Sequence, residues 1–101
     1  MPTITKFTTP TIGFNLPFNI SYLSKAYVTL VQKPVVIEKT IDDCVLDGTT
    51  ISVNLTQEET GRLESGWMVK VQLRCLTNDG KAYASQEFRM EVVGTLKEGV
   101  I

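Results

Sequence analysis

The 101-residue sequence contains no histidine. This absence excludes Ser–His–Asp and Cys–His catalysis and histidine-based zinc sites, because each of them needs an imidazole. Only two cysteines are present, Cys44 and Cys75, which are too few for a cysteine-rich metal centre. The seven glycines are dispersed, and no glycine-rich phosphate-binding loop is found. We therefore expect no catalytic residues, no metal site, no cofactor and no enzymatic activity.

An excess of positive charge is also lacking, since 10 Lys and Arg residues face 11 Asp and Glu residues and the formal net charge is −1. Nucleic acids and anionic membranes are recognised by basic surfaces, so we expect neither partner. No run approaches the roughly 18 apolar residues of a membrane span. The first six residues lack the apolar core of a signal peptide, so we expect a protein that is not secreted by that route.

Two states remain open for Cys44 and Cys75. Each cysteine lies in an apolar, strand-like run, where a free thiol behaves as a small buried hydrophobe. Without a secretion signal, reduced thiols are favoured, and a single disulfide between the two is the alternative.

The most regular pattern lies between residues 66 and 93, which we predict to form a long hairpin around the turn Asn78-Asp79-Gly80. In its first strand alternate residues form an apolar face, namely Trp67, Val69, Val71, Leu73 and Cys75. In the returning strand the predicted inward set is Ala82, Ala84, Phe88, Met90 and Val92, and the opposite set is Tyr83, Ser85, Glu87, Arg89 and Glu91. The rest of the chain is expected to pack on this apolar face.

Shorter β-branched or alternating runs predict further strands at residues 11–16, 25–32, 35–39, 42–46 and 50–55. In residues 25–32 both parities are apolar, which indicates a strand covered on both faces or in contact with a partner. Thr56 and Glu59 match a capping box, so we predict one short helix at Thr56–Arg62, with Leu63 packed beneath the sheets. Residues 1–10 are predicted to be an N-terminal arm and residues 11–101 a single β-sandwich of about seven strands; a flattened barrel is the alternative.

Two local motifs are given no functional meaning. The acidic residues Asp42, Asp43 and Asp47 lack the ligand spacing of a calcium loop, and a solvated hairpin end is the favoured interpretation. The triplets that begin at Asn19 and Asn54 match the glycosylation signal, but without a secretion signal they are interpreted as chance matches.

Aromatic side chains suggest a possible sugar-binding face, because aromatic rings stack on the apolar faces of sugars. Trp67 shares the parity of the core set, so packing is the expected role for this residue. Tyr27 and Tyr83 are the better surface candidates.

More apolar material is present than one small core requires, as the residues Phe18, Tyr22, Tyr27, Met68, Val93, Val100 and Ile101 illustrate. A few exposed apolar side chains are normal for any soluble protein. The functional interpretation is a subunit interface with a homo-oligomer as the product, since edge strands and spare apolar surface are buried on association. The predicted interface residues are Tyr27, Met68, Val93, Val100 and Ile101.

The runs 50–60, 71–74 and 76–82, with Ser85 and residues 96–101, resemble a family of small phage and prophage proteins from bacteria of the Firmicutes type. More distantly, the opening strand with Thr11, Phe14 and Leu16 resembles that of the immunoglobulin-like N-terminal domain of phage baseplate upper proteins. The resemblance implies an immunoglobulin-like sandwich that assembles with itself and with other phage structural proteins, in the virion or the host cytoplasm. The expected function is therefore that of a small tail or baseplate component; a stand-alone carbohydrate- or ligand-binding module is the alternative.

Overall fold

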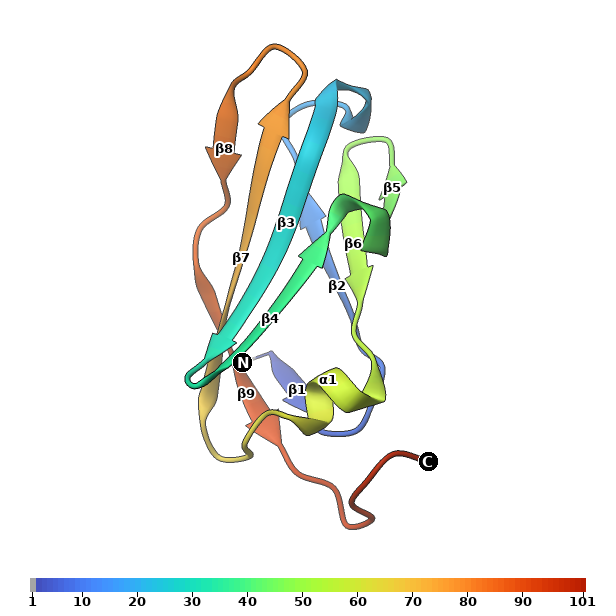
Figure 1. Cartoon of the computed structure of the whole chain (residues 1–101), viewed down its shortest axis with the longest axis vertical. Coiled ribbons are helices and arrows are strands. Elements are labelled where there is room, and N and C mark those ends of the chain that lie inside the picture. The colour runs from blue at the N-terminus through green and yellow to red at the C-terminus, as the bar shows by residue number, and fades with distance from the viewer. Residues whose placement is uncertain (1) are drawn as a thin grey trace.

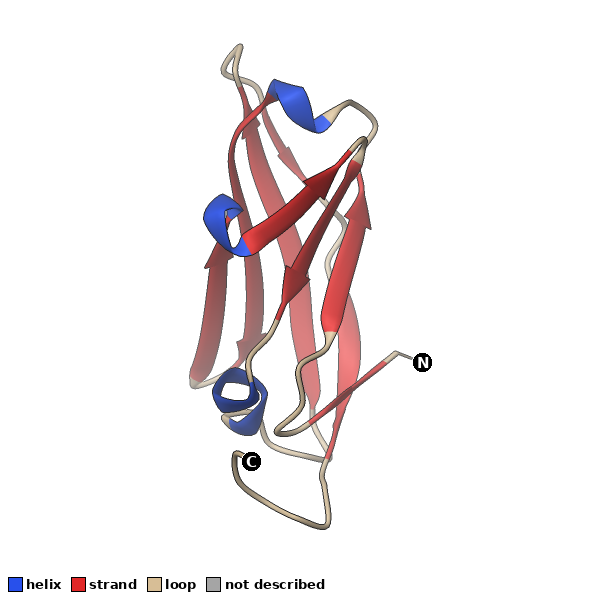
Figure 2. Ribbon diagram, turned by 90° about the vertical axis from the view of Figure 1, so that its right-hand side faces the viewer, coloured by secondary structure: helices blue, strands red, loops and turns tan. Residues whose placement is uncertain are grey.

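The computed structural model describes residues 2–101; Met1, the first residue of the predicted arm, lies outside the described residues. The described chain forms an elongated body of 47 × 23 × 23 Å in which the strands follow the long axis (Figures 1 and 2). Its elements in order are β1 (Thr3–Thr5), β2 (Thr11–Asn15), the 3₁₀ turn η1 (Ile20–Tyr22), β3 (Leu23–Gln32), β4 (Val35–Thr40), the 3₁₀ turn η2 (Ile41–Asp43), β5 (Cys44–Asp47), β6 (Thr50–Asn54), α1 (Gln57–Gly61), β7 (Met68–Thr77), β8 (Ala82–Ala84) and β9 (Phe88–Val93).

The strands form two sheets that share no strand. One sheet has six strands in the order β1-β9-β7-β3-β4, with β8 also paired to β7, and the other has three strands in the order β2-β6-β5. Every pairing is antiparallel except that of β1 with β9. Two mainly antiparallel sheets, with one short helix, form a β-sandwich, so the predicted fold class is confirmed. The described residues contain nine strands, where about seven were predicted.

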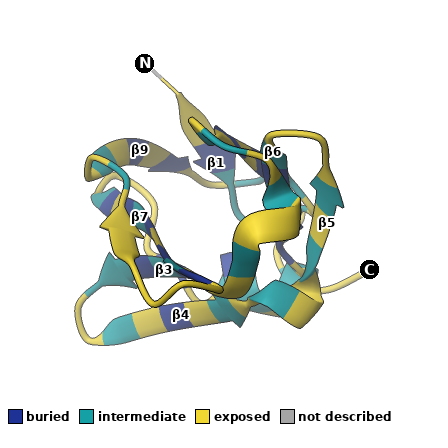
Figure 3. Ribbon diagram, turned by 90° about the horizontal axis from the view of Figure 1, so that it is seen from above, coloured by how far each residue is buried: buried dark blue, intermediate teal, exposed yellow. Residues whose placement is uncertain are grey.

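The core lies between the two sheets; in the end-on view of Figure 3, β9, β7, β3 and β4 curve along one side of it, and β6 and β5 lie on the other. The alternation predicted for the central strand is confirmed from Val69 onwards, because β7 buries every second residue. Facing it, β2 and β6 bury alternate residues in the same way. The buried apolar residues include Phe14, Val28, Leu30, Ile51, Val53, Val69, Val71, Leu73 and Val92.

The N-terminal segment differs from the predicted arm. Residues Thr3–Thr5 form β1, which pairs in parallel with β9 and places Ile4 opposite Val92. Ile4 is completely buried. The reason is that one β-branched residue between two threonines suits a strand whose inner face needs a single large side chain. The described part of this segment therefore belongs to the sandwich.

The returning strand of the long hairpin is interrupted. The turn is as predicted: Gly80 has φ +86°, and its N–H donates to the carbonyl of Thr77 at 3.0 Å. Farther on, Ala84 pairs with Arg74 and Phe88 pairs with Val71. Two residues lie between these partners on β7, whereas three residues, 85–87, lie between Ala84 and Phe88. The additional residue makes a β-bulge and reverses the parity between β8 and β9.

The bulge changes which β8 side chains face inward. Tyr83 pairs with Cys75, whose side chain belongs to the core, whereas Ala82 and Ala84 pair with Leu76 and Arg74 on the outside. Cross-strand partners lie on the same face of a sheet. The predicted inward positions of the two alanines, and the predicted outward position of Tyr83, are therefore wrong.

Trp67 is also placed differently from the prediction of a core residue. Its side chain is 66% exposed, because β7 begins only at Met68. Gly66, with φ +84°, forms the turn before it. The alternation that holds inside β7 therefore does not extend to Trp67.

The short helix is confirmed. The hydroxyl of Thr56 accepts the N–H of Glu59 at 3.2 Å, and the carboxylate of Glu59 accepts the N–H of Thr56 at 2.8 Å. Leu63 is buried directly after the helix, as predicted. Lys39 of β4 pairs with the same carboxylate at 2.8 Å, which joins the six-stranded sheet to α1.

None of the helices in the described part of the chain has the length and apolar character needed to cross a membrane.

Candidate functional site: the outer face of the six-stranded sheet

Three of the five predicted interface residues share one surface. Tyr27 of β3, Met68 of β7 and Val93 of β9 all point away from the core, as their alternation with buried neighbours requires. We call this surface the large face; on its two central strands it consists of Lys25, Tyr27, Thr29, Val31, Met68, Lys70, Gln72, Arg74 and Leu76.

Three open hollows follow one another along the large face. The first, of about 390 Å³, is lined by Lys25, Tyr27, Thr29, Glu38, Arg74, Cys75, Leu76 and Ala82. The second, of about 220 Å³, is lined by Thr29, Val31, Lys70, Val71, Gln72 and Glu87. The third, of about 450 Å³, is lined by Val31, Gln32, Lys33, Glu64, Trp67, Met68 and Lys70. Neighbouring hollows share lining residues, so the three form one continuous depression along the large face.

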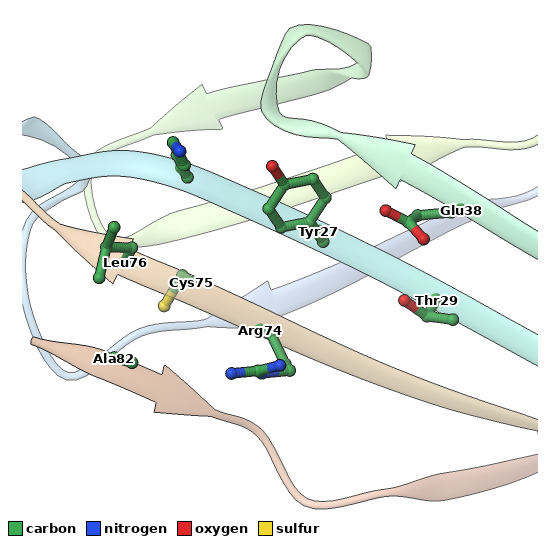
Figure 4. A pocket seen from close by; sticks show the side chains of 8 residues that line it. Tyr27, Thr29, Glu38, Arg74, Cys75, Leu76 and Ala82 are labelled. Atoms are coloured by element: carbon green, nitrogen blue, oxygen red, sulfur yellow. The ribbon is translucent and has the colours of Figure 1, made fainter.

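Four adjacent strands supply the first hollow (Figure 4). Tyr27 projects from β3 between Glu38 of β4 and Arg74 of β7, and Leu76 and Ala82 add apolar carbon beyond them. Tyrosine and arginine are enriched at protein interfaces, where they pack beside aliphatic carbon. Backbone pairing between the neighbouring strands fixes the positions from which these side chains project.

At the other end of the large face, the sequence analysis missed two contributors. Trp67 and Val36 are 66% and 50% exposed, and Val36 lies beside Val31 of β3 on the outer side of the sheet. The position of Val31, the β3 neighbour of Val36, was indicated in the sequence by the apolar residues of both parities in residues 25–32. For Trp67 the signal was Gly66, whose freedom to adopt positive φ indicates a turn directly before the strand.

The outer face of the three-stranded sheet, which we call the small face, is very different. Its outward positions on β2, β6 and β5 are Thr11, Gly13, Asn15, Thr50, Ser52, Asn54, Val45 and Asp47. Small polar side chains dominate there, and Val45 is the large apolar exception among these positions, with 71% exposure. The two outer faces therefore differ sharply in aromatic, aliphatic and cationic content.

The remaining predicted interface residues lie elsewhere. Val100 and Ile101 belong to the C-terminal segment that follows β9, next to α1. The side-chain amide of Gln57 accepts the N–H of Ile101 at 2.8 Å and donates to its carbonyl at 3.2 Å. The backbone of Ile101 is thereby held, while its side chain is 87% exposed. These two residues form a second apolar surface, separate from the large face.

Tyr27 and Tyr83 do not form a common sugar-binding platform. Tyr27 lies on the large face, whereas Tyr83 lies on the opposite side of the sheet and packs against Phe18, with ring centroids 5.3 Å apart. The bulge between β8 and β9 is the reason for this difference.

Of the acidic residues near β5, Asp43 has a local structural role. The carboxylate of Asp43 accepts the N–H of Thr40 at 2.9 Å, and this hydrogen bond lowers the pKa of Asp43. Residues 2–101 contain no group of three or more side chains placed to hold a metal ion. Cys44 and Cys75 are both free, and burial raises the pKa of each thiol.

Comparison with known proteins returns no match to the chain, either among family models or among curated proteins.

Proposed function

We propose that the protein is a small phage or prophage structural component, of the tail or baseplate, that works by assembly through its large face. The resemblance in residues 50–60, 71–74 and 76–82 supports the viral origin. The observation that carries the assembly role is the contrast between the two outer faces, since only the large face combines Tyr27, Met68 and Trp67 with arginine and lysine. The partners are further copies of the chain and other phage structural proteins, in the virion or the host cytoplasm.

The large face has a suitable size for this role. Ten-residue strands such as β3 and β7 are roughly 33 Å long at about 3.3 Å per residue. Four adjacent strands spaced by about 4.8 Å then give a face of roughly 600 Å². Stable protein interfaces bury about 800 Å² on each partner, so this face would supply most of one subunit contact and the surrounding loops the remainder.

The first test is the solution mass, measured by light scattering across a dilution series. We expect a closed oligomer whose mass persists on dilution, because closure buries the apolar surface of every subunit. Met68→Asp places a charge in the interface, and we expect it to lower the mass towards that of the monomer without altering the fold.

Val45→Asp is the matched control, because it makes the same kind of change on the small face and should leave the mass unchanged. Ile101→Asp tests whether the C-terminal apolar surface also takes part in assembly. A wild-type monomer at every concentration, or a Met68→Asp variant with the wild-type mass, would contradict self-assembly through the large face. Circular dichroism of each variant verifies that the sandwich is intact.

A further inference from the structure

A second site lies at the end of the sandwich where the β7–β8 turn meets η1, the upper end of Figure 1. Here a pocket of about 360 Å³ is lined by Phe18, Tyr22, Thr77, Asn78, Asp79, Lys81 and Tyr83. None of these residues lines the hollows of the large face. The pocket is therefore independent of the proposed assembly function, and its volume falls at the lower end of the range for small-molecule sites.

Three aromatic rings from three separate segments converge on this pocket. Phe18 follows β2, Tyr22 belongs to η1 and Tyr83 belongs to β8. Phe18 and Tyr83 are in contact, yet Tyr83 remains 43% exposed and Tyr22 remains 60% exposed. A structural role in the core would bury these rings, so their exposure leaves apolar surface available for a ligand.

The backbone holds Tyr22 in place. Its N–H donates to the carbonyl of Asn19 at 3.1 Å, and its carbonyl accepts the N–H of Asn78 at 2.7 Å. The side-chain amide of Asn78 also donates to the carbonyl of Ser21 at 3.1 Å. These bonds tie η1 to the β7–β8 turn, so the aromatic and polar parts of the pocket are fixed relative to each other.

The polar rim offers both hydrogen-bond donors and acceptors. One carboxylate oxygen of Asp79 accepts the hydroxyl of Thr77, which leaves the other oxygen as an acceptor. Asn78 has its amide oxygen as an acceptor, and Lys81 supplies an ammonium donor. The charges of Asp79 and Lys81 are opposite, so the rim as a whole is neutral.

We propose that this pocket binds a neutral pyranose sugar. A pyranose presents an apolar C–H face to aromatic rings and a set of hydroxyls, each both donor and acceptor, to a mixed polar rim. A purely apolar ligand would remove water from the charges of Asp79 and Lys81 without replacing its hydrogen bonds, which is costly. The opposite charges of Asp79 and Lys81 cancel, so the rim gives no net electrostatic attraction to a ligand of either charge. The saccharide-binding alternative is thereby moved from the Tyr27 surface to this end of the sandwich.

The experiment is an NMR titration of the full chain with methyl β-D-glucopyranoside, methyl β-D-galactopyranoside and N-acetyl-D-glucosamine. We expect at least one of the three to shift the resonances of Tyr22, Asn78, Asp79 and Tyr83 in a saturable manner. Tyr22→Ala removes an exposed ring that the core does not require, and it should weaken binding by about fivefold or more, as expected for the loss of one aromatic contact. Asp79→Asn keeps the acceptor for Thr77 but removes the charge, and it should also weaken binding.

Tyr27→Ala is the control, because it removes an exposed tyrosine from the large face, with 38% exposure against 60% for Tyr22, and should leave sugar binding unchanged. The proposal is overturned if none of the three sugars shifts these resonances at about 50 mM, far above a millimolar dissociation constant. It is equally overturned if Tyr22→Ala, shown to be folded by its amide spectrum, binds as tightly as the wild type. Neither result bears on the oligomeric mass, so failure of this site and failure of the proposed assembly are distinguishable.

Discussion

Phe7 shows how single residues stabilise a junction between distant parts of the chain. Its φ of +58° lies in the left-handed region, which is uncommon for residues other than glycine. Next to it, the hydroxyl of Thr60, which is completely buried, accepts the N–H of Thr8 at 3.1 Å and donates to the carbonyl of Thr8 at 2.9 Å. The ring of Phe7 packs on Gly61 at the end of α1. The unusual backbone conformation is thus compensated by hydrogen bonds and packing against the helix.

Substitution of Gly61 tests this junction. A β-carbon at Gly61 would lie 2.3 Å from Cε1 of Phe7, so the ring must move. Alanine gains about 0.5–1 kcal/mol as a better helix former, whereas overpacking costs about 1–3 kcal/mol. We therefore expect Gly61→Ala to lower the free energy of unfolding by about 1 kcal/mol, measured by urea denaturation.

The control is the same substitution in a Phe7→Ala background. There the clash is absent, and Gly61→Ala should be neutral or stabilising. Equal effects of Gly61→Ala with and without the Phe7 ring would show that the two residues are not coupled.

At the scale of elements, the bulge between β8 and β9 determines which side chains line each surface. Ser85 still follows the register of β8, since its N–H donates to the carbonyl of Leu73 at 2.8 Å. The additional residue is therefore found at Gln86-Glu87, opposite Gln72. Two residues facing one is the defining feature of a bulge.

We expect deletion of Gln86 to be tolerated. Removing one residue at the bulge joins β8 and β9 into one regular strand without changing the β7 partner of either. The free energy of unfolding should therefore change by less than about 1 kcal/mol, measured by urea denaturation.

Deletion of Glu91 is the matched control. It should shift β9 by one residue and turn Met90 and Phe88 out of the core, with a loss of several kcal/mol. If the two deletions destabilise the protein equally, the register described for β8 and β9 is incorrect.

The bulge also marks the limit of what the pattern of the sequence could predict. Strands β2, β6 and β7 follow from alternation, because one buried face imposes period two, and the cap of α1 follows from a capping box. Strand β3 follows from its β-branched and aromatic composition. Residues 85–87 are all polar, so the alternation of apolar and polar residues cannot be followed through them. Nothing in them reveals an inserted residue. For this reason Tyr83 was predicted on the wrong side of the sheet. The pocket that it lines with Phe18 and Tyr22 was therefore not predicted. Tyr27 and Met68 were predicted as interface residues from their apolar character, but their position on one face follows only from the pairing of β3 with β7.

At the scale of the whole molecule, stability is expected to depend on the charge of Glu59. Partial burial raises the pKa of Glu59, but hydrogen bonds from Lys39 and from the N–H of Thr56 outweigh it, so the pKa lies below its ordinary value of 4.5. A carboxyl with a lowered pKa in the folded state stabilises the fold above its ordinary pKa. That contribution is lost as the pH falls through the folded value.

The prediction concerns the difference in unfolding free energy between the wild type and Glu59→Gln, measured by urea denaturation from about pH 7 to about pH 3. The variant keeps a capping side chain but lacks the charge. We expect the advantage of the wild type to be constant at neutral pH and to shrink below pH 4.5. Asp43 and Asp79, whose pKa values are also lowered, are present in both proteins, so their effects cancel. A difference that is independent of pH would show that the ion pair with Lys39 does not stabilise the fold.

The pairing of β1 with β9 has a consequence for the order of folding. It joins Ile4 to Val92, so nearly the whole chain lies in the loop that this contact closes. The entropic cost of closure grows with loop length, and contacts of this range form late. The hairpins β3–β4 and β5–β6 are local and assemble early. Until β1 pairs, β9 is an open edge to which a second chain can add, so we expect the three residues of β1 to lower the tendency of the folding chain to aggregate.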